Sequence, residues 1–188
     1  MVVDEKGLMR AMNAAYKVDG YKVAVDDSAD IENVIISCPL WTVVIQKSEL
    51  PRKVLGLIAE HVGEIPKPGT AYQVKKKQTQ TEIFSMAIQV LKDFHSDEKA
   101  RRIIRRTSLI LGGYPLWQTA TDQRVVEVIP ELEEIMCWGS YVVRLIGDDL
   151  MMIDDNVSRA YIRCYPPKDD SARMAKLEHL AKIQWVAE

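Results

Sequence analysis

Cysteine, histidine and glycine are scarce in this 188-residue chain, and their spacing excludes several classes of site. Cys38, Cys137 and Cys164 stand far apart, with no CxxC pair and no spacing typical of zinc ligands, so we expect reduced thiols. The three histidines, His61, His95 and His179, lie far apart in the sequence, without a partner at metal spacing. Gly112-Gly113 fits neither phosphate-binding glycine pattern. We therefore expect neither a metal nor a cofactor.

Long apolar runs are also missing. No run approaches the roughly 18 residues that a membrane-spanning helix needs, and the sequence starts Met-Val-Val-Asp-Glu-Lys, without the apolar core of a signal peptide. A cytoplasmic protein is the expectation. The chain is 47% hydrophobic and has four Trp and seven Tyr, which excludes a wholly disordered protein.

Charge is present in both signs but unevenly distributed. The net charge is −2. Residues 67–106 hold ten Lys and Arg against four Asp and Glu, whereas residues 107–170 hold five against eleven. Such segregation suits a polar interface with a partner, although opposite charges within the protein could also satisfy it.

The first part of the chain alternates helix and strand signals. Apolar spacing predicts a helix over residues 4–17 and another from Ser48, as N-cap, to His61, with Gly63 as its stop. Strands are expected at 21–25, 34–36 and 41–45. Pro66-Lys67-Pro68-Gly69 is the clearest linker. It either separates two small subdomains, 1–65 and 70–188, or turns a corner within one domain, 1–188.

The remainder is richer in strands. Residues 72–80 are polar on both faces and indicate an exposed edge strand or hairpin arm. Further helices are expected at 82–94, 97–110, 130–136 and 169–184, and strands at 124–129, 141–146, 150–153 and 159–165. Their connections are too short for parallel crossovers. The sequence therefore predicts an α+β fold, a mainly antiparallel sheet with helices packed on it.

A basic stripe is the most informative local feature. Ser96 is a good N-cap for the expected helix at 97–110, in which Ala100, Ile103, Ile104, Thr107 and Leu111 would form the buried face. Arginine pairs bidentately with phosphate or carboxylate. We expect a partner-binding surface made of the stripe and the lysine run before it. Its residues are Lys75, Lys76, Lys77, Lys99, Arg101, Arg102, Arg105 and Arg106.

Two alternatives to this binding surface remain open. The stripe could be a solvated helix face, or the protein's own acids could neutralise it. Lys75 to Lys77 could instead protect an edge strand against aggregation. Aromatic residues are not interleaved with the basic ones along the sequence, so a stacking platform for single-stranded nucleic acid is not indicated.

Two aspartate doublets, Asp148-Asp149 and Asp154-Asp155, are the strongest catalytic candidates. Paired carboxylates can hold Mg²⁺ for phosphoryl chemistry. The same residues also favour tight turns, as Gly-Asp-Asp and Asp-Asp-Asn. We predict that Asp148 and Asp149 close a turn and hold no catalytic metal.

The sequence thus favours a non-catalytic interaction protein. We expect a small inhibitor or adaptor, of the kind that mobile genetic elements carry against CRISPR systems, which binds a protein or a protein–nucleic-acid assembly through charged surfaces. Direct contact with nucleic acid is left open. The alternatives are a metal-dependent phosphodiesterase or nuclease that uses the four aspartates, and a subunit of a homo-oligomer such as a homodimer.

Overall fold

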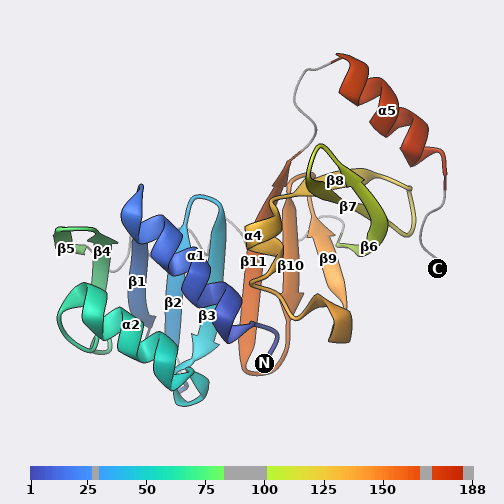
Figure 1. Ribbon diagram of the computed structural model, residues 1–188. Coiled ribbons are helices and arrows are strands. Elements are labelled where there is room, and N and C mark those ends of the chain that lie inside the picture. Colours follow the sequence, from blue (N-terminus) through green and yellow to red (C-terminus); the bar gives the residue numbers. More distant parts are fainter. Residues whose placement is uncertain (27–29, 83–100, 166–170, 184–188) are drawn as a thin grey trace.

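The computed structural model describes residues 1–26, 30–82, 101–165 and 171–183 (Figure 1). The helices are α1 (Glu5–Lys17), α2 (Arg52–Val62), α4 (Pro130–Glu133) and α5 (Ser171–Ala181), with single 3₁₀ turns at Lys47–Glu49 and Trp138–Ser140. The strands are β1 (Tyr21–Asp26), β2 (Asn33–Cys38), β3 (Trp41–Gln46), β4 (Ala71–Lys75), β5 (Gln78–Glu82), β6 (Arg102–Leu111), β7 (Tyr114–Thr119), β8 (Val125–Val128), β9 (Val143–Ile146), β10 (Leu150–Asp154) and β11 (Ser158–Tyr165). The predicted α+β class is confirmed.

The strands form one antiparallel sheet with two differently shaped parts. Their order is β10-β9-β6-β7-β8-β11-β3-β2-β1-β4-β5, and β10 also pairs with β11. The strands β6, β7, β8, β11, β10 and β9 therefore close into a ring. The strands from β3 to β5 continue from β11 as an open sheet (Figure 1).

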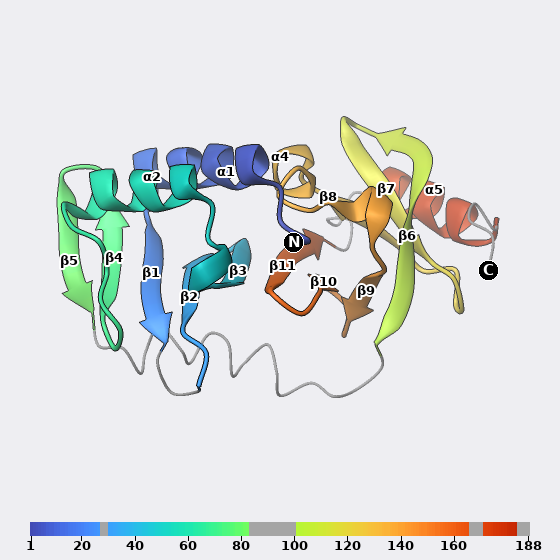
Figure 2. The same ribbon diagram turned by 90° about the horizontal axis from the view of Figure 1, so that it is seen from below.

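Helices α1 and α2 cover one face of the open sheet (Figure 2). Helix α1 begins where predicted, because the Asp4 carboxylate accepts the backbone N–H of Gly7 at 2.7 Å. Helix α2 ends at Gly63, whose φ of 92° provides the left-handed cap expected there. Ser48 does not cap it: residues 47–49 form a separate 3₁₀ turn, and α2 starts after Pro51.

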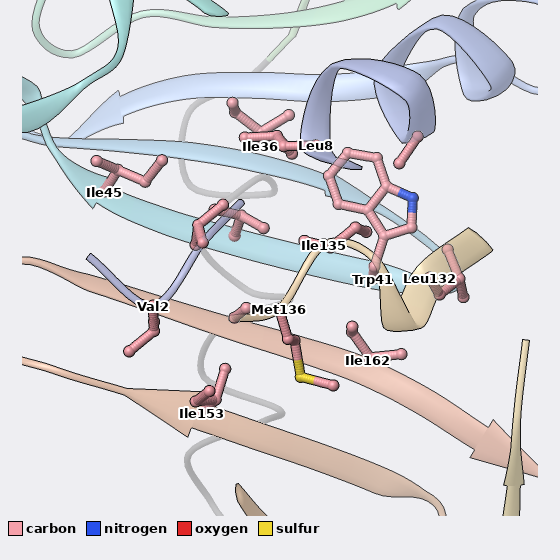
Figure 3. Close-up of a cluster of buried hydrophobic side chains, with 14 of the residues drawn as sticks. Val2, Leu8, Ile36, Trp41, Ile45, Leu132, Ile135, Met136, Ile153 and Ile162 are labelled. Carbon is pink, nitrogen blue, oxygen red and sulfur yellow. The ribbon is translucent and has the colours of Figure 1, made fainter. Parts of the chain in front are cut away.

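The first residues of the chain lie between the two parts of the sheet. Val2 and Val3 are buried, and the main chain there pairs with the turn after α4: Asp4 N–H donates to Ile135 O and Cys137 N–H donates to Val2 O, both at 2.8 Å. Figure 3 shows Val2 and Met136 beside side chains of β10, β11 and the open sheet. The buried core is therefore continuous from the open sheet into the ring.

The expected basic helix at 97–110 is wrong, because residues 102–111 are strand β6. β6 forms a hairpin with β7 through Gly112-Gly113, whose φ angles of 58° and 89° fit a two-residue hairpin turn. Pairing with β7 and β9 stabilises the extended conformation of these residues, although their apolar side chains also recur at helical spacing. The expected helix at 82–94, Ser96 and Lys99 lie outside the described residues.

The chain after the predicted linker returns to the open sheet. β4 pairs with β1 and β5 pairs with β4, which confirms a hairpin over residues 72–80. The Gly69 N–H donates to Val25 O at 2.8 Å, so the linker turns back along β1. The division into units 1–65 and 70–188 stays a prediction.

The buried His61 side chain of α2 contacts Tyr16 of α1 and Tyr21 of β1. Its ring stacks on Tyr16 with centroids 3.8 Å apart, and Nδ1 lies 3.0 Å from the Tyr21 hydroxyl. Burial lowers the pKa of His61, and this outweighs the opposing charge of Glu60. The folded state therefore disfavours the imidazolium.

We predict that Gly7→Ala lowers the free energy of unfolding by about 1–3 kcal/mol in chemical denaturation. A Cβ at Gly7 would lie 1.9 Å from the backbone carbonyl oxygen of Glu134, which cannot easily move. Gly56→Ala in α2 is the matched control. Its Cβ meets nothing within 4 Å, and the better helix propensity of alanine should raise stability by up to about 1 kcal/mol. Equal effects of the two substitutions would contradict the close approach of α1 to the turn after α4.

We also predict that stability falls as the pH drops through the ordinary pKa of histidine, 6.5. Because the folded-state pKa of His61 is lowered, the unfolded chain binds a proton that the folded chain excludes, and acid favours unfolding. Denaturant titrations from pH 8 to pH 5 measure the slope. His61→Gln should reduce it, whereas the same change at exposed His179 should leave it as it is. An unchanged slope in His61→Gln would refute this role.

Candidate protein-interaction site

Strand β6 distributes the basic stripe over its two faces. Successive side chains of a strand point to opposite sides, so Arg102, Ile104 and Arg106 share one face of β6, and Ile103 and Arg105 share the other. Arg101 directly precedes the strand. Ile104 is buried inside the ring. The first set therefore faces inward, and the second set faces outward from the ring.

Arg102 is bound internally at one rim of the ring. Its guanidinium donates to Asp122 at 2.6 Å, to the Gly147 carbonyl, and to Asp148 at 3.4 Å. Arg124 pairs with the same Asp148 carboxylate. These contacts join β6 to the turn between β9 and β10.

Arg106 is bound internally at the other rim. Its Nε donates at 2.7 Å to Glu133, and the Trp117 indole N–H donates to the same Glu133 oxygen at 2.9 Å. The Arg106 guanidinium also lies 5.4 Å from the ring centroid of Trp138, a cation–π distance. Glu133 is 8% exposed, so this carboxylate is held by two charge-assisted contacts in a largely dry environment.

A partner-binding surface made of all four arginines would need all four to be exposed, and two of them are not. Arg102 and Arg106 are half-buried and neutralised by the protein's own acids, as one alternative held. Arg101 and Arg105 are exposed. The partner-binding role of the set stays a prediction.

A groove runs beside Arg105 and Arg106. It has a volume of about 460 Å³ and is lined by residues 103–106 of β6, Trp117 of β7, and residues 138–143, which lead into β9. Four of the large apolar side chains on its walls are exposed, namely Ile103, Trp138, Tyr141 and Val142. Among the described residues that line this groove, none is acidic. We call it the arginine–aromatic groove.

The aromatic part of this groove was not anticipated. Trp138 and Tyr141 are distant from β6 in sequence and reach it only because β9 pairs with β6. Trp138 also packs edge-on against Trp117, with centroids 5.8 Å apart and an interplanar angle of 81°. The exposed Trp-Gly-Ser-Tyr-Val run at 138–142 was the available signal, since apolar residues outside a regular element are candidates for a contact surface.

The lysine run lies elsewhere. Lys75 ends β4, and Lys76 and Lys77 form the exposed turn into β5. β5 stands at the opposite end of the strand order from the ring (Figure 1). The predicted residues that the structure describes thus lie on two separate surfaces.

The aspartates are divided between the two ends of β10. Asp148 and Asp149 lie in the turn between β9 and β10, as predicted, and Asp149 pairs with Arg163 at 3.0 Å. Asp154 pairs with Arg144 at 2.8 Å, and Asp155 accepts the Ser158 N–H at 2.7 Å. The structure does not bring the four carboxylates into one cleft. No group of three or more His, Cys, Asp and Glu side chains placed to hold a metal ion occurs in the described part of the chain.

The three cysteines are free thiols. Burial raises the pKa of Cys164 to about 12 and also raises the pKa values of Cys38 and Cys137. A thiol with a raised pKa is a poor nucleophile near neutral pH, because little thiolate forms.

Comparisons of sequence and structure with known proteins give no family model, no curated protein and no solved structure that matches this chain. Within the described ranges, no helix has the length and apolar character that a membrane crossing needs.

We predict that Arg106→Ala lowers the free energy of unfolding by about 1–3 kcal/mol, because Glu133 would remain buried with one fewer donor. Arg101→Ala is the matched control, since its side chain is exposed, and we expect a change within about 0.5 kcal/mol. Thermal and denaturant unfolding of the two variants provide the comparison. The division of the stripe into structural and exposed arginines fails if both variants are equally stable.

Proposed function

We propose that this chain is a non-catalytic interaction protein, an inhibitor or adaptor that binds a protein, alone or within a protein–nucleic-acid assembly. The observation that carries the proposal is the arginine–aromatic groove. It combines exposed apolar side chains, two arginines and no acidic residue among its described lining. Aromatic residues and arginine are enriched at the cores of protein interfaces, where the partner supplies apolar and acidic groups.

Exposed charge around the groove would attract an acidic partner. Arg105 lies on the outward face of β6 and Arg101 directly precedes the strand, and both side chains are exposed. Complementary charges speed association and fix orientation. A partner segment held in this groove would be covered by the chain, so the chain would act by stoichiometric occupation of the partner and not by turnover.

We predict that Arg101→Glu with Arg105→Glu reduces partner recovery about tenfold or more, equivalent to about 1.4 kcal/mol. Tagged chain is incubated with extract of its source cells, with and without nuclease, and the co-purifying proteins are quantified at low and high salt. Recovery by the unmutated protein should fall at high salt, since salt screens exposed charge.

Lys6→Glu with Arg52→Glu is the matched control for this experiment. It makes the same charge change on exposed residues of α1 and α2, away from the groove. Recovery should be retained in this control. Unchanged recovery by the β6 double variant at both salt concentrations would show that the proposed surface does not bind. Recovery that disappears with nuclease in all variants would show that nucleic acid is the direct contact.

A further inference from the structure

The arginine–aromatic groove follows the edge of β6 and not one of its faces. Ile103 and Arg105 point outward and Ile104 and Arg106 point inward, yet all four line the groove. Side chains of both faces border the same space only at the side of a strand, where a neighbouring strand would lie. The groove therefore occupies the position of a missing strand.

The lengths of the two paired strands explain why this position is open. β6 has ten residues, whereas β9 has four, and the register joins only residues 102–104 to residues 143–145. Before β9 the chain turns away through the 3₁₀ turn Trp138–Ser140. β6 thus continues beyond the end of β9, and the β6–β7 hairpin extends toward the side of the sheet that carries the helices (Figure 2).

The backbone alternation of β6 places hydrogen-bonding groups at this edge. The carbonyl of Ile103 accepts the N–H of Ala120 at 3.0 Å, on the β7 side. Alternate residues of a strand direct their main-chain N–H and C=O groups to alternate sides. The main-chain groups of Ile104 therefore point toward β9, and those of Arg106 point to the same side, just past the end of β9. An added strand would meet the N–H and C=O of Arg106, the last residue of β6 before its register with β7 shifts between Arg106 and Ile110.

We propose that the groove binds an extended segment of a partner protein that adds to β6 as the next antiparallel strand, with apolar and acidic side chains alternating. The proposal rests on the proposed function and names its partner's chemistry. Apolar side chains of the segment would point inward beside Trp138, while acidic side chains would point outward beside Arg105. Cross-strand pairs of opposite charge stabilise antiparallel sheets, and strand addition is a recurrent mode of peptide recognition.

Single-stranded nucleic acid fits the groove less well. A stacking platform needs an accessible aromatic face, whereas Trp138 is engaged by the Arg106 guanidinium and by Trp117. Arg106 is also neutralised by Glu133. Among the described residues that line the groove, Arg105 is the other cation, which is too little charge for a row of successive phosphates, so the observations favour a protein segment.

The test uses a blocked ten-residue peptide of alternating Glu and Leu, titrated calorimetrically into the full chain. We expect saturable binding with one peptide per chain, weakened at least about tenfold by Arg105→Glu and unaffected by the exposed control Arg52→Glu. The matching Lys–Leu peptide should not bind. Equal binding of the two peptides, no binding of either, or tighter binding of a ten-residue oligothymidylate would overturn the proposal.

N-methylated peptides test the backbone pairing itself. A residue opposite Arg106 has its side chain on the inward face and its N–H toward β6, so methylation of the Leu nitrogens should abolish binding. Methylation of the Glu nitrogens should change the affinity of the peptide by less than about twofold, because those N–H groups face away from β6. Equal effects of the two methylation patterns would overturn strand addition while leaving the proposed function intact. Failure of the proposed function shows separately, as unchanged partner recovery by the β6 double variant.

Discussion

Strand β11 is hydrogen-bonded along both edges, and the rest of the fold depends on this pairing. One edge pairs with β10 over residues 150–154, and the other pairs first with β3 and then, at Cys164 and Tyr165, with β8. The ring and the open sheet therefore share one strand, and residues 2–4 close the junction between them. Because neither part can lose β11 without exposing its core, we infer that the two parts form one cooperative unit.

Because side chains alternate between the two faces of β6, its arginines divide into a structural group and an exposed group. Inward-facing Arg106 enters an ion pair that would be costly to break, because the Glu133 carboxylate is buried and shared with the Trp117 indole. Outward-facing Arg105 and the preceding Arg101 are exposed, where charge contributes little to stability and more to association. The groove lies where β6 extends beyond the end of β9, so the proposed binding edge is a consequence of unequal strand lengths.

Much of the fold could be predicted from local patterns. Caps and turns identified α1 and the end of α2, and apolar runs separated by short turns identified the strands of the β9–β10–β11 meander. β6 was missed because Ile104, Thr107 and Leu111 also fit helical spacing. The density of β-branched residues at 103–110 and a Gly-Gly pair between two apolar runs were the signals for a hairpin. The groove could not be predicted, since it depends on pairing between distant strands.

Native-state hydrogen exchange tests the shared role of β11 most directly. If the ring and the open sheet form one cooperative unit, the slowest amides of β9 and β10 should exchange with the same opening free energy and the same denaturant dependence as those of β1 and β2. Two distinct classes, with one part opening at clearly lower free energy while the other stays protected, would contradict the account.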